Sequence, residues 1–307
     1  MSGRGPAVGA NVPDDGLTTR HSGQPFGVGA SAAVGADVSA DVPDDGLTDA
    51  AAVSFENVSK WFRSKARLTH ALSQVSFSVE PEEFVSLIGP SGCGKSTMLR
   101  LAGGLLEADR GRVAVHSRPP DEARRQKRYG FVPQHPALLP WRTVRDNVSL
   151  LCEVNRRRSD AGMAEHDKLA MLDAIGLTPF LDALPQELSG GLQQRASIAR
   201  AFALGAPLLL MDEPFSALDE ITRADMRYLL LDLWRRNAKT VLFVTHSIPE
   251  AVALSDRVVV LSGRPGRVTT VVEVALSRPR HAGVEDSDEF HRILAEVRDA
   301  LRHGWSH

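Results

Sequence analysis

The chain has 307 residues, of which 43% are apolar and 24% charged, the ordinary balance of a soluble globular protein. A formal net charge of -2 gives no overall attraction to a polyanion, which argues against a dedicated nucleic-acid-binding protein. Two cysteines cannot build a disulfide framework, and no apolar run approaches the ~20 residues of a membrane-spanning helix, so we expect one α/β domain in a reducing cytoplasm.

The first fifty residues form a distinct segment in composition, rich in Gly, Ala, Val and Asp. They carry the sequence VPDDGLT twice, at Val12–Thr18 and at Val42–Thr48, and they lack the compact apolar core of a signal peptide. Such a segment buries too little apolar surface to offset its ordering entropy. We therefore expect a disordered extension over residues 1–50, with a tether or partner-binding role left open, and a folded domain over residues 51–280.

The folded part begins with β-rich stretches separated by turn residues. Strands are expected at Val53–Val58, Val75–Val79 and Phe84–Ile88, and a glycine-rich loop then opens a helix at Lys95. Further on, three continuous apolar runs are separated by helix-length segments, which indicates buried parallel strands joined by crossover helices. These runs are Leu208–Met211, Thr240–Val244 and Val258–Leu261.

Two other segments have helical periodicity. Between about residues 135 and 188 the apolar residues recur at helical spacing, so we expect a helical subdomain there. Residues 281–307 contain an amphipathic stretch from Ser287 to His303, with acidic residues at its start and Arg302 near its end. This pattern predicts a terminal helix that packs on the body and is capped by Gly304.

A phosphate-binding loop is the strongest chemical signal in the chain. Residues Gly89–Ser96 match G-x-x-x-x-G-K-[ST] and lie between a predicted strand and a predicted helix. Backbone amides and the helix N-terminus would surround the β-phosphate, Lys95 would bridge the β- and γ-phosphates, and the Ser96 hydroxyl would ligate Mg²⁺. The predicted nucleotide-binding residues of this loop are Gly89, Pro90, Ser91, Gly92, Cys93, Gly94, Lys95, Ser96 and Thr97.

Two adjacent carboxylates follow the apolar run that starts at Leu208. Asp212 and Glu213 lie at the C-terminal tip of this strand, where α/β sheets present their ligands. Asp212 suits Mg²⁺, usually through water, and Glu213 can polarise an attacking water as a general base. Such a pair by itself is more often a solvated strand end, and its combination with the phosphate loop is what favours catalysis.

Four further elements occur in a fixed order around these motifs. They are Gln134 after a short strand, Leu188–Arg195 (LSGGLQQR), Ser216–Asp219 and His246. Together with the phosphate loop and the carboxylates, they resemble the ABC ATPase family over residues 53–280. The resemblance implies a P-loop NTPase with a RecA-like core, an antiparallel β subdomain and a helical subdomain, and it implies ATP and Mg²⁺ as cofactors.

The resemblance also implies a homodimer with ATP between its subunits. Three residues at the start of a predicted helix would bind the γ-phosphate of the ATP held by the opposite subunit, because the N-terminal amides of a helix favour an anion. These residues are Ser189, Gly190 and Gly191. Asp219 would pack across the same interface. Leu192 departs from the glutamine that is commoner in the family, and we expect this difference to leave activity intact because the phosphate contacts come from its neighbours.

The remaining family positions imply catalytic and adenine-binding roles. Gln134 would contact the Mg²⁺ ion and the attacking water and link the core to the helical subdomain. His246 would hold the γ-phosphate and orient Glu213. An aromatic ring near the first strand would stack on adenine, with Phe62 favoured over its rival Trp61, and one of the two rings is expected in the core.

Within the family, the chain is similar to the nitrate, sulfonate, taurine and bicarbonate importer branch. The similarity rests on Leu138–Trp141, on the apolar Leu192, on Arg278–Arg280 before a short terminal segment and on the lack of an appended domain. It implies a separate transmembrane permease, an indirect role for an extracytoplasmic solute-binding protein, and a place at the cytoplasmic face of the membrane. Trp141 either packs in the core or lies near the groove that receives the permease. The solute itself cannot be deduced, because this subunit never touches it.

Three other functional classes fit less well. A soluble ABC ATPase acting on nucleic acid or ribosomes would show a coiled-coil insertion or two tandem cassettes, and a regulatory binding module would lack Glu213 or His246. A kinase or GTPase would not need Leu188–Arg195. The basic clusters Arg124–Arg128 and Arg156–Arg158 are interpreted as solvated faces, with contacts to anionic lipid as the alternative.

Overall fold

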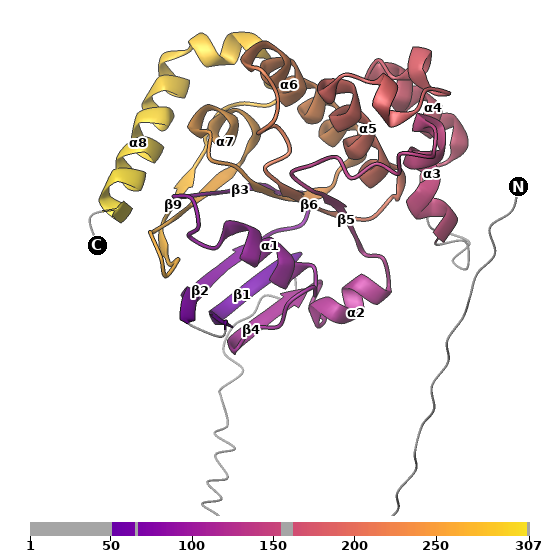
Figure 1. Ribbon diagram of the computed structural model, residues 1–307. Helices are drawn as coiled ribbons and strands as arrows, with labels where there is room; N and C mark the ends of the chain where they lie inside the picture. Colours follow the sequence, from indigo (N-terminus) through magenta and orange to yellow (C-terminus); the bar gives the residue numbers. More distant parts are fainter. Residues whose placement is uncertain (1–50, 65–66, 155–161, 306–307) are drawn as a thin grey trace, which may run out of the picture. The chain divides into compact units, whose positions relative to one another are not determined.

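The computed structural model describes residues 51–64, 67–154 and 162–305 (Figure 1). Both copies of VPDDGLT and the Arg156–Arg158 cluster lie outside these ranges, so the expectations for them remain open. Among the helices of the described ranges, none combines the length and apolar character needed to cross a membrane.

A three-stranded antiparallel sheet begins the fold. It consists of β1 (Val53–Arg63), β2 (Leu68–Val79) and β4 (Arg110–Val115) in the order β2-β1-β4. β1 and β2 extend well beyond the predicted strands, since Trp61 pairs with His70 past several register shifts. The side chains in this half of the hairpin are exposed or half-buried. Backbone hydrogen bonds hold its strands together, and it lacks the alternation of apolar and polar residues from which strands are predicted.

The central sheet has six strands in the order β5-β6-β7-β3-β8-β9. Neighbouring strands from β5 to β8 are parallel, and β9 is antiparallel to β8. Every residue of β3 and β7 is buried, as expected for strands covered on both faces. This arrangement confirms the α/β P-loop fold with a separate antiparallel β subdomain. The six strands are β3 (Phe84–Ile88), β5 (Tyr129–Val132), β6 (Leu208–Asp212), β7 (Thr240–Val244), β8 (Arg257–Leu261) and β9 (Val268–Glu273).

Helices cover the central sheet and form a cluster at one end of it. Figure 1 shows α3 and α4 beside α5, near the β5 end of the sheet, whereas α8 lies at the other end, near β9. The helices before α8 are α1 (Lys95–Ala102), α2 (Pro120–Arg125), α3 (Val144–Val154), α4 (Glu165–Ala174), α5 (Gly190–Ala203), α6 (Glu220–Asn237) and α7 (Ile248–Leu254). Short 3-10 segments in the described ranges are η1 (Thr178–Phe180), η2 (Pro185–Glu187) and η3 (Ala282–Asp286).

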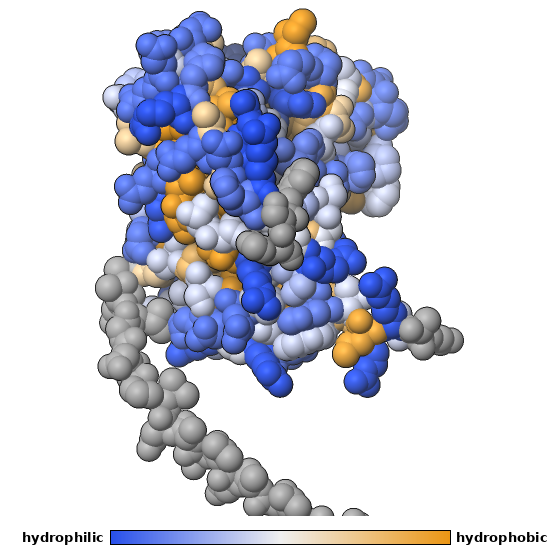
Figure 2. Space-filling model, turned by 90° about the vertical axis from the view of Figure 1, so that its left-hand side faces the viewer, coloured by the Kyte–Doolittle hydropathy of each residue, from blue (hydrophilic) through white to orange (hydrophobic). Residues whose placement is uncertain are grey.

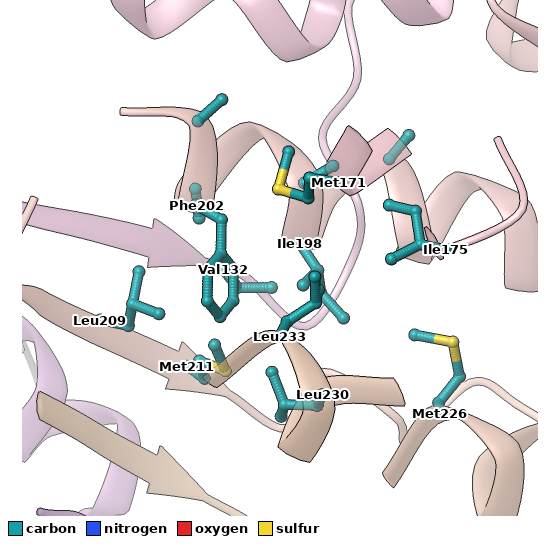
Figure 3. Close-up of a cluster of buried hydrophobic side chains, with 14 of the residues drawn as sticks. Val132, Met171, Ile175, Ile198, Phe202, Leu209, Met211, Met226, Leu230 and Leu233 are labelled. Carbon is teal, nitrogen blue, oxygen red and sulfur yellow. The ribbon is translucent and has the colours of Figure 1, made fainter. Parts of the chain in front are cut away.

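One apolar cluster joins the α3–α4 region to the central sheet. In Figure 3, Ile198 and Phe202 of α5 lie among side chains from β5, β6 and α6, with Met171 of α4 on the far side of α5. Complete burial of a side chain of this size stabilises the fold by about 1.5–3 kcal/mol. α5 is therefore held firmly between the two regions, and its N-terminus has a fixed position.

The C-terminal helix α8 (Asp288–Trp305) packs along α7 and β8 through the apolar face that its periodicity predicts. Its buried residues are Phe290, Ile293, Val297 and Leu301. The surface on the side of α8 is mostly hydrophilic (Figure 2). The predicted cap at Gly304 is wrong, because this glycine is inside the helix. A Cβ there would lie 3.3 Å from the Thr269 side chain, so the glycine permits close packing against the hairpin of β8 and β9.

Candidate nucleotide site

The phosphate loop connects the end of β3 to the start of α1. Gly94 has a φ of +106°, and a Cβ at this position would come within 2.5 Å of Leu72 in β2. Only glycine tolerates both the left-handed backbone and this approach. The loop therefore curls tightly at the N-terminus of α1, where helix amides favour an anion.

Lys95 lies folded against this loop and is only 6% exposed. Its Nζ donates hydrogen bonds to the carbonyl oxygens of Gly89, at 2.8 Å, and of Pro90, at 3.1 Å. Burial raises the pKa of the neighbouring Cys93 thiol. The loop thus holds its cation in place while the thiol stays protonated.

A cavity of 410 Å³ opens beside the loop, a volume within the range of small-molecule sites. It brings together residues from the phosphate loop, the antiparallel sheet, the segment after β5 and the end of β6. The lining residues are Phe62, Thr69, Ala71, Ser91, Gly92, Gly94, Lys95, Ser96, Thr97, Gln134, Glu213 and Arg264. Of the predicted loop residues, Gly89, Pro90 and Cys93 do not line it.

Oxygen-bearing side chains suitable for Mg²⁺ meet at the start of α1. Ser96 Oγ donates a hydrogen bond of 2.8 Å to Asp212 Oδ1, and Gln134 lines the same cavity. Burial raises the pKa of Asp212, opposed by the Ser96 hydrogen bond. The described residues contain no cluster of three His, Cys, Asp or Glu side chains that could hold a metal ion. This donor set fits Mg²⁺, which usually combines one or two carboxylates with substrate phosphates.

Glu213 and His246 form a pair at the ends of β6 and β7. Glu213 Oε2 lies 3.0 Å from His246 Nδ1. The backbone of Glu213 has a φ of +44°, in the left-handed region that non-glycine residues rarely adopt. Such a conformation costs on the order of 1–3 kcal/mol and is typical of functional sites. It turns Glu213 out of the line of the strand, and Glu213 lines the cavity that Lys95 also lines.

The two aromatic rings near the end of β1 have different surroundings. Phe62 lines the cavity and is 39% exposed, whereas Trp61 stacks on His70 with ring centroids 4.4 Å apart. Neither ring belongs to a core cluster, so the expectation that one of them packs in the core is wrong. The reason is the extension of the β1–β2 hairpin, which carries both residues away from the interior.

A second cavity, of 340 Å³, lies where α5 and α6 begin. Ser189 caps α5 by accepting a hydrogen bond of 3.4 Å from the Leu192 amide. Asp219 caps α6 by accepting two hydrogen bonds from Thr222, which lower the pKa of its carboxyl group. The cavity is lined by Ser189, Gly190, Gly191, Leu192, Arg195, Ala217, Leu218, Asp219 and Thr222. It shares no lining residue with the first cavity, so a single chain keeps Lys95 and Ser189 in separate sites.

Sequence reasoning missed three residues of the first cavity, Thr69, Ala71 and Arg264. None belongs to a recognisable motif, and only the fold brings them beside the phosphate loop. Trp141 is 73% exposed, which excludes the core-packing alternative. Arg124 is exposed with the other basic residues of its cluster.

Comparison with known proteins agrees with this geometry. The family model described as ABC transporter matches residues 72–216. An aliphatic sulfonates import ATP-binding protein, SsuB, from Bacillus thuringiensis subsp. konkukian is 36% identical over 82% of this chain and 96% of its own length. A taurine import ATP-binding protein, TauB, from Rhizobium johnstonii is 41% identical over 80% of this chain and 94% of its own.

A solved structure of similar fold is a dimeric ATP-binding cassette in a post-hydrolysis state, bound to ADP and Pi. It is 33% identical, has a TM-score of 0.62 and covers 73% of this chain and all of its own. An uncharacterized ABC transporter ATP-binding protein from Methanocaldococcus jannaschii is 40% identical over 80% of this chain and 91% of its own length. The chain therefore belongs to the ABC transporter family, as one of its ATP-hydrolysing cassettes.

Proposed function

We propose that this chain is the ATPase subunit of an importer, in which two copies couple ATP hydrolysis to solute uptake through a separate permease. The separation of the site into two cavities carries this proposal. One cavity contains the cation and the carboxylate of a hydrolytic site, and the other contains an open helix N-terminus. A second copy can bring the two halves together around one nucleotide.

The N-terminus of α5 supports a contact with a group from outside the chain. A Cβ at Gly190 would meet no atom within 4 Å, so packing within the chain does not require glycine there. α5 has 14 residues, and the amides of its first turn carry partial positive charge. The γ-phosphate of ATP bound to the other subunit fits this position, with Asp219 at the same interface.

The residues of the first cavity supply the chemistry of hydrolysis in this proposal. Lys95 exchanges its loop carbonyls for the β- and γ-phosphates. Ser96, Asp212 and Gln134 would hold Mg²⁺, which would supply positive charge next to the phosphates. Glu213 takes a proton from the attacking water, and His246, already within hydrogen-bonding distance of Glu213, keeps its carboxylate oriented.

The direction of transport and the solute class follow from the relatives. Two of them are named as import proteins, for aliphatic sulfonates and for taurine, and each matches about four fifths of this chain. We therefore propose uptake of a small sulfonate-, taurine- or nitrate-like solute, with an extracytoplasmic solute-binding protein acting indirectly. The cassette would lie at the inner face of the membrane. The alternative of a soluble ABC ATPase acting on nucleic acid or ribosomes gains no support from these names.

Subunit mixing tests the shared site. Lys95→Ala and Ser189→Arg homodimers should both be inactive, because every site in either dimer carries one lesion. In the mixed dimer both lesions fall in one site, and the other site is intact. We expect this dimer to occlude about one ATP, measured as trapped nucleotide per dimer.

Size measurement must first show that mixed dimers form. Hydrolysis can return less fully than occlusion, because closure of the dimer normally uses two nucleotides. If mixed dimers form and neither occlude nor hydrolyse ATP, the shared-site proposal is wrong.

A further inference from the structure

Arg264 lines the nucleotide cavity without belonging to any of the sequence motifs. It lies in the loop between β8 and β9, far along the chain from the phosphate loop. Its side chain reaches the cavity beside β2, next to Gly92. This position makes Arg264 a second cation of the cavity in addition to Lys95.

The loop that carries Arg264 is fixed on both sides. The Gly266 amide donates to the Ala71 carbonyl at 2.9 Å, and the Ser73 amide donates to the Gly266 carbonyl at 2.9 Å. A Cβ at Gly266 would collide with the carbonyl oxygen of Cys93 in the phosphate loop. The loop is thus wedged between β2 and the phosphate loop, and the backbone of Arg264 has a defined place.

The guanidinium group is only partly used within the chain. Its Nε donates a hydrogen bond of 3.1 Å to the Gly92 carbonyl. In the part of the chain that the structure describes, its Nη atoms have no hydrogen bond and no carboxylate lies within 4.0 Å of it. The charge is therefore not neutralised by a neighbouring acid, at the edge of a cavity suited to phosphates.

We propose that Arg264 is a nucleotide-contacting residue whose Nη groups bind the phosphate chain of the nucleotide. The inference rests on the nucleotide site proposed above. A guanidinium group forms charge-assisted, forked hydrogen bonds with phosphate oxygens, and its Nε anchor on Gly92 orients the fork in advance. Arg264 thus approaches the nucleotide from the wall formed by the β8–β9 loop, whereas Lys95 approaches from the start of α1.

Arg267 provides a matched control on the same loop. Arg264 also lines a larger cavity of 1040 Å³, together with Arg267 and His303, between this loop and the end of α8. Arg267 is exposed, and it lines the larger cavity but not the nucleotide cavity. Arg264→Gln and Arg267→Gln therefore remove the same charge from one loop, but only Arg264→Gln removes it from the nucleotide cavity.

The experiment measures ATP binding to the full chain in EDTA, so that hydrolysis does not interfere. Arg264→Gln should weaken ATP binding by about 10-fold, which corresponds to about 1.4 kcal/mol. The loss should shrink as NaCl is raised, because salt screens the charge. Arg264→Lys should bind with intermediate affinity, and Arg267→Gln should bind within about twofold of wild type.

Two outcomes would overturn the inference while leaving the nucleotide site in place. In the first, wild type binds ATP and Arg264→Gln binds equally well, or no worse than Arg267→Gln. In the second, Arg264→Lys is as weak as Arg264→Gln and both melt at lower temperature, which would show that the side chain only supports the loop. A wild-type chain that does not bind ATP would contradict the proposed function itself.

Discussion

At the scale of single residues, the surroundings of Glu213 suit the general base that we propose. The residue combines a left-handed φ, an amide hydrogen bond of 2.9 Å to Val244 and a carboxylate in contact with His246. Asp212, one position earlier, has its carboxylate on Ser96 instead. Two adjacent carboxylates thus point to different partners, one at the proposed ion and one at the proposed water.

Replacing Glu213 by glutamine separates catalysis from binding. Glu213→Gln keeps the shape of the side chain and a contact with His246, and it loses the ability to accept a proton. A general base contributes about 100- to 10,000-fold to a rate, so ATP hydrolysis should fall by this order while ATP binding stays near the wild-type level. Phosphate release and nucleotide binding, measured on the same preparation, check both parts. Hydrolysis at the wild-type rate would exclude Glu213 as the base.

At the scale of elements, a buried network connects the segment that ends at Asp219 with the segment that carries His246. Arg223 of α6 donates a hydrogen bond of 2.8 Å to the Leu218 carbonyl, and its Nε lies 3.6 Å from Glu250 of α7. Glu250 in turn accepts a hydrogen bond from Thr245, directly before His246. The two loops therefore share one pair of charged side chains.

Glu250→Gln should impair hydrolysis without affecting ATP affinity. The side-chain oxygen of the glutamine can still accept a hydrogen bond from Thr245. Its side-chain nitrogen, however, then places N–H groups opposite the N–H groups of Arg223. Because small displacements of catalytic groups strongly reduce the reaction rate, we expect turnover to fall on the order of 10-fold. ATP affinity should stay within about twofold of wild type. Steady-state hydrolysis and equilibrium binding separate the two quantities.

Arg227→Met is the control for this change. Arg227 lies one turn further along α6 and forms a hydrogen bond of 3.0 Å with Glu285, near the C-terminal helix. Its loss should lower the melting temperature more than it lowers turnover. Equal effects of the two substitutions on turnover would argue against a specific role of Glu250.

The same elements show what a sequence pattern can and cannot predict. β3 and β7 match their predicted ranges because continuous burial on both faces leaves a continuous apolar run. The outer half of the β1–β2 hairpin has no such apolar run, since its side chains are mostly solvated. Gly304 resembled a helix cap but serves a packing contact with Thr269, which only the fold creates.

The candidate site likewise contains residues that the sequence pattern indicates and residues that only the fold brings together. Lys95, Ser96, Asp212 and Glu213 could be proposed from local motifs because the chemistry of phosphate binding and hydrolysis restricts their types and spacing. Arg264 could not, because its contact with Gly92 joins residues 172 positions apart and depends on the neighbouring positions of β3 and β8.

At the scale of the whole molecule, the segment from Gln134 to Trp141 connects the nucleotide cavity to the surface. Arg200 of α5 donates hydrogen bonds of 2.8 Å to the carbonyls of Pro136 and Ala137. The buried Asn147 of α3 bonds both the amide and the carbonyl of Leu139. The chain thus fixes this segment from two helices while leaving the Trp141 ring 73% exposed. Within the described residues, nothing covers most of this ring. A binding partner at this surface would bury it.

Trp141→Ala should therefore impair coupling and spare the isolated subunit. Because the ring is mostly solvated, its removal should leave basal ATP hydrolysis and the melting temperature close to wild type. A tryptophan at the centre of an interface is worth about 2 kcal/mol or more, so binding to the permease should weaken about 30-fold or more. The measurements are co-purification with the proposed permease and permease-stimulated hydrolysis in the assembled complex. Leu105→Ala is the control, because Leu105 is another apolar residue with half its surface exposed, and it lies after α1, outside the fixed segment. If Trp141→Ala assembles and is stimulated like wild type, the permease contacts another surface, whereas equal losses in both variants would reflect general surface apolarity rather than this ring.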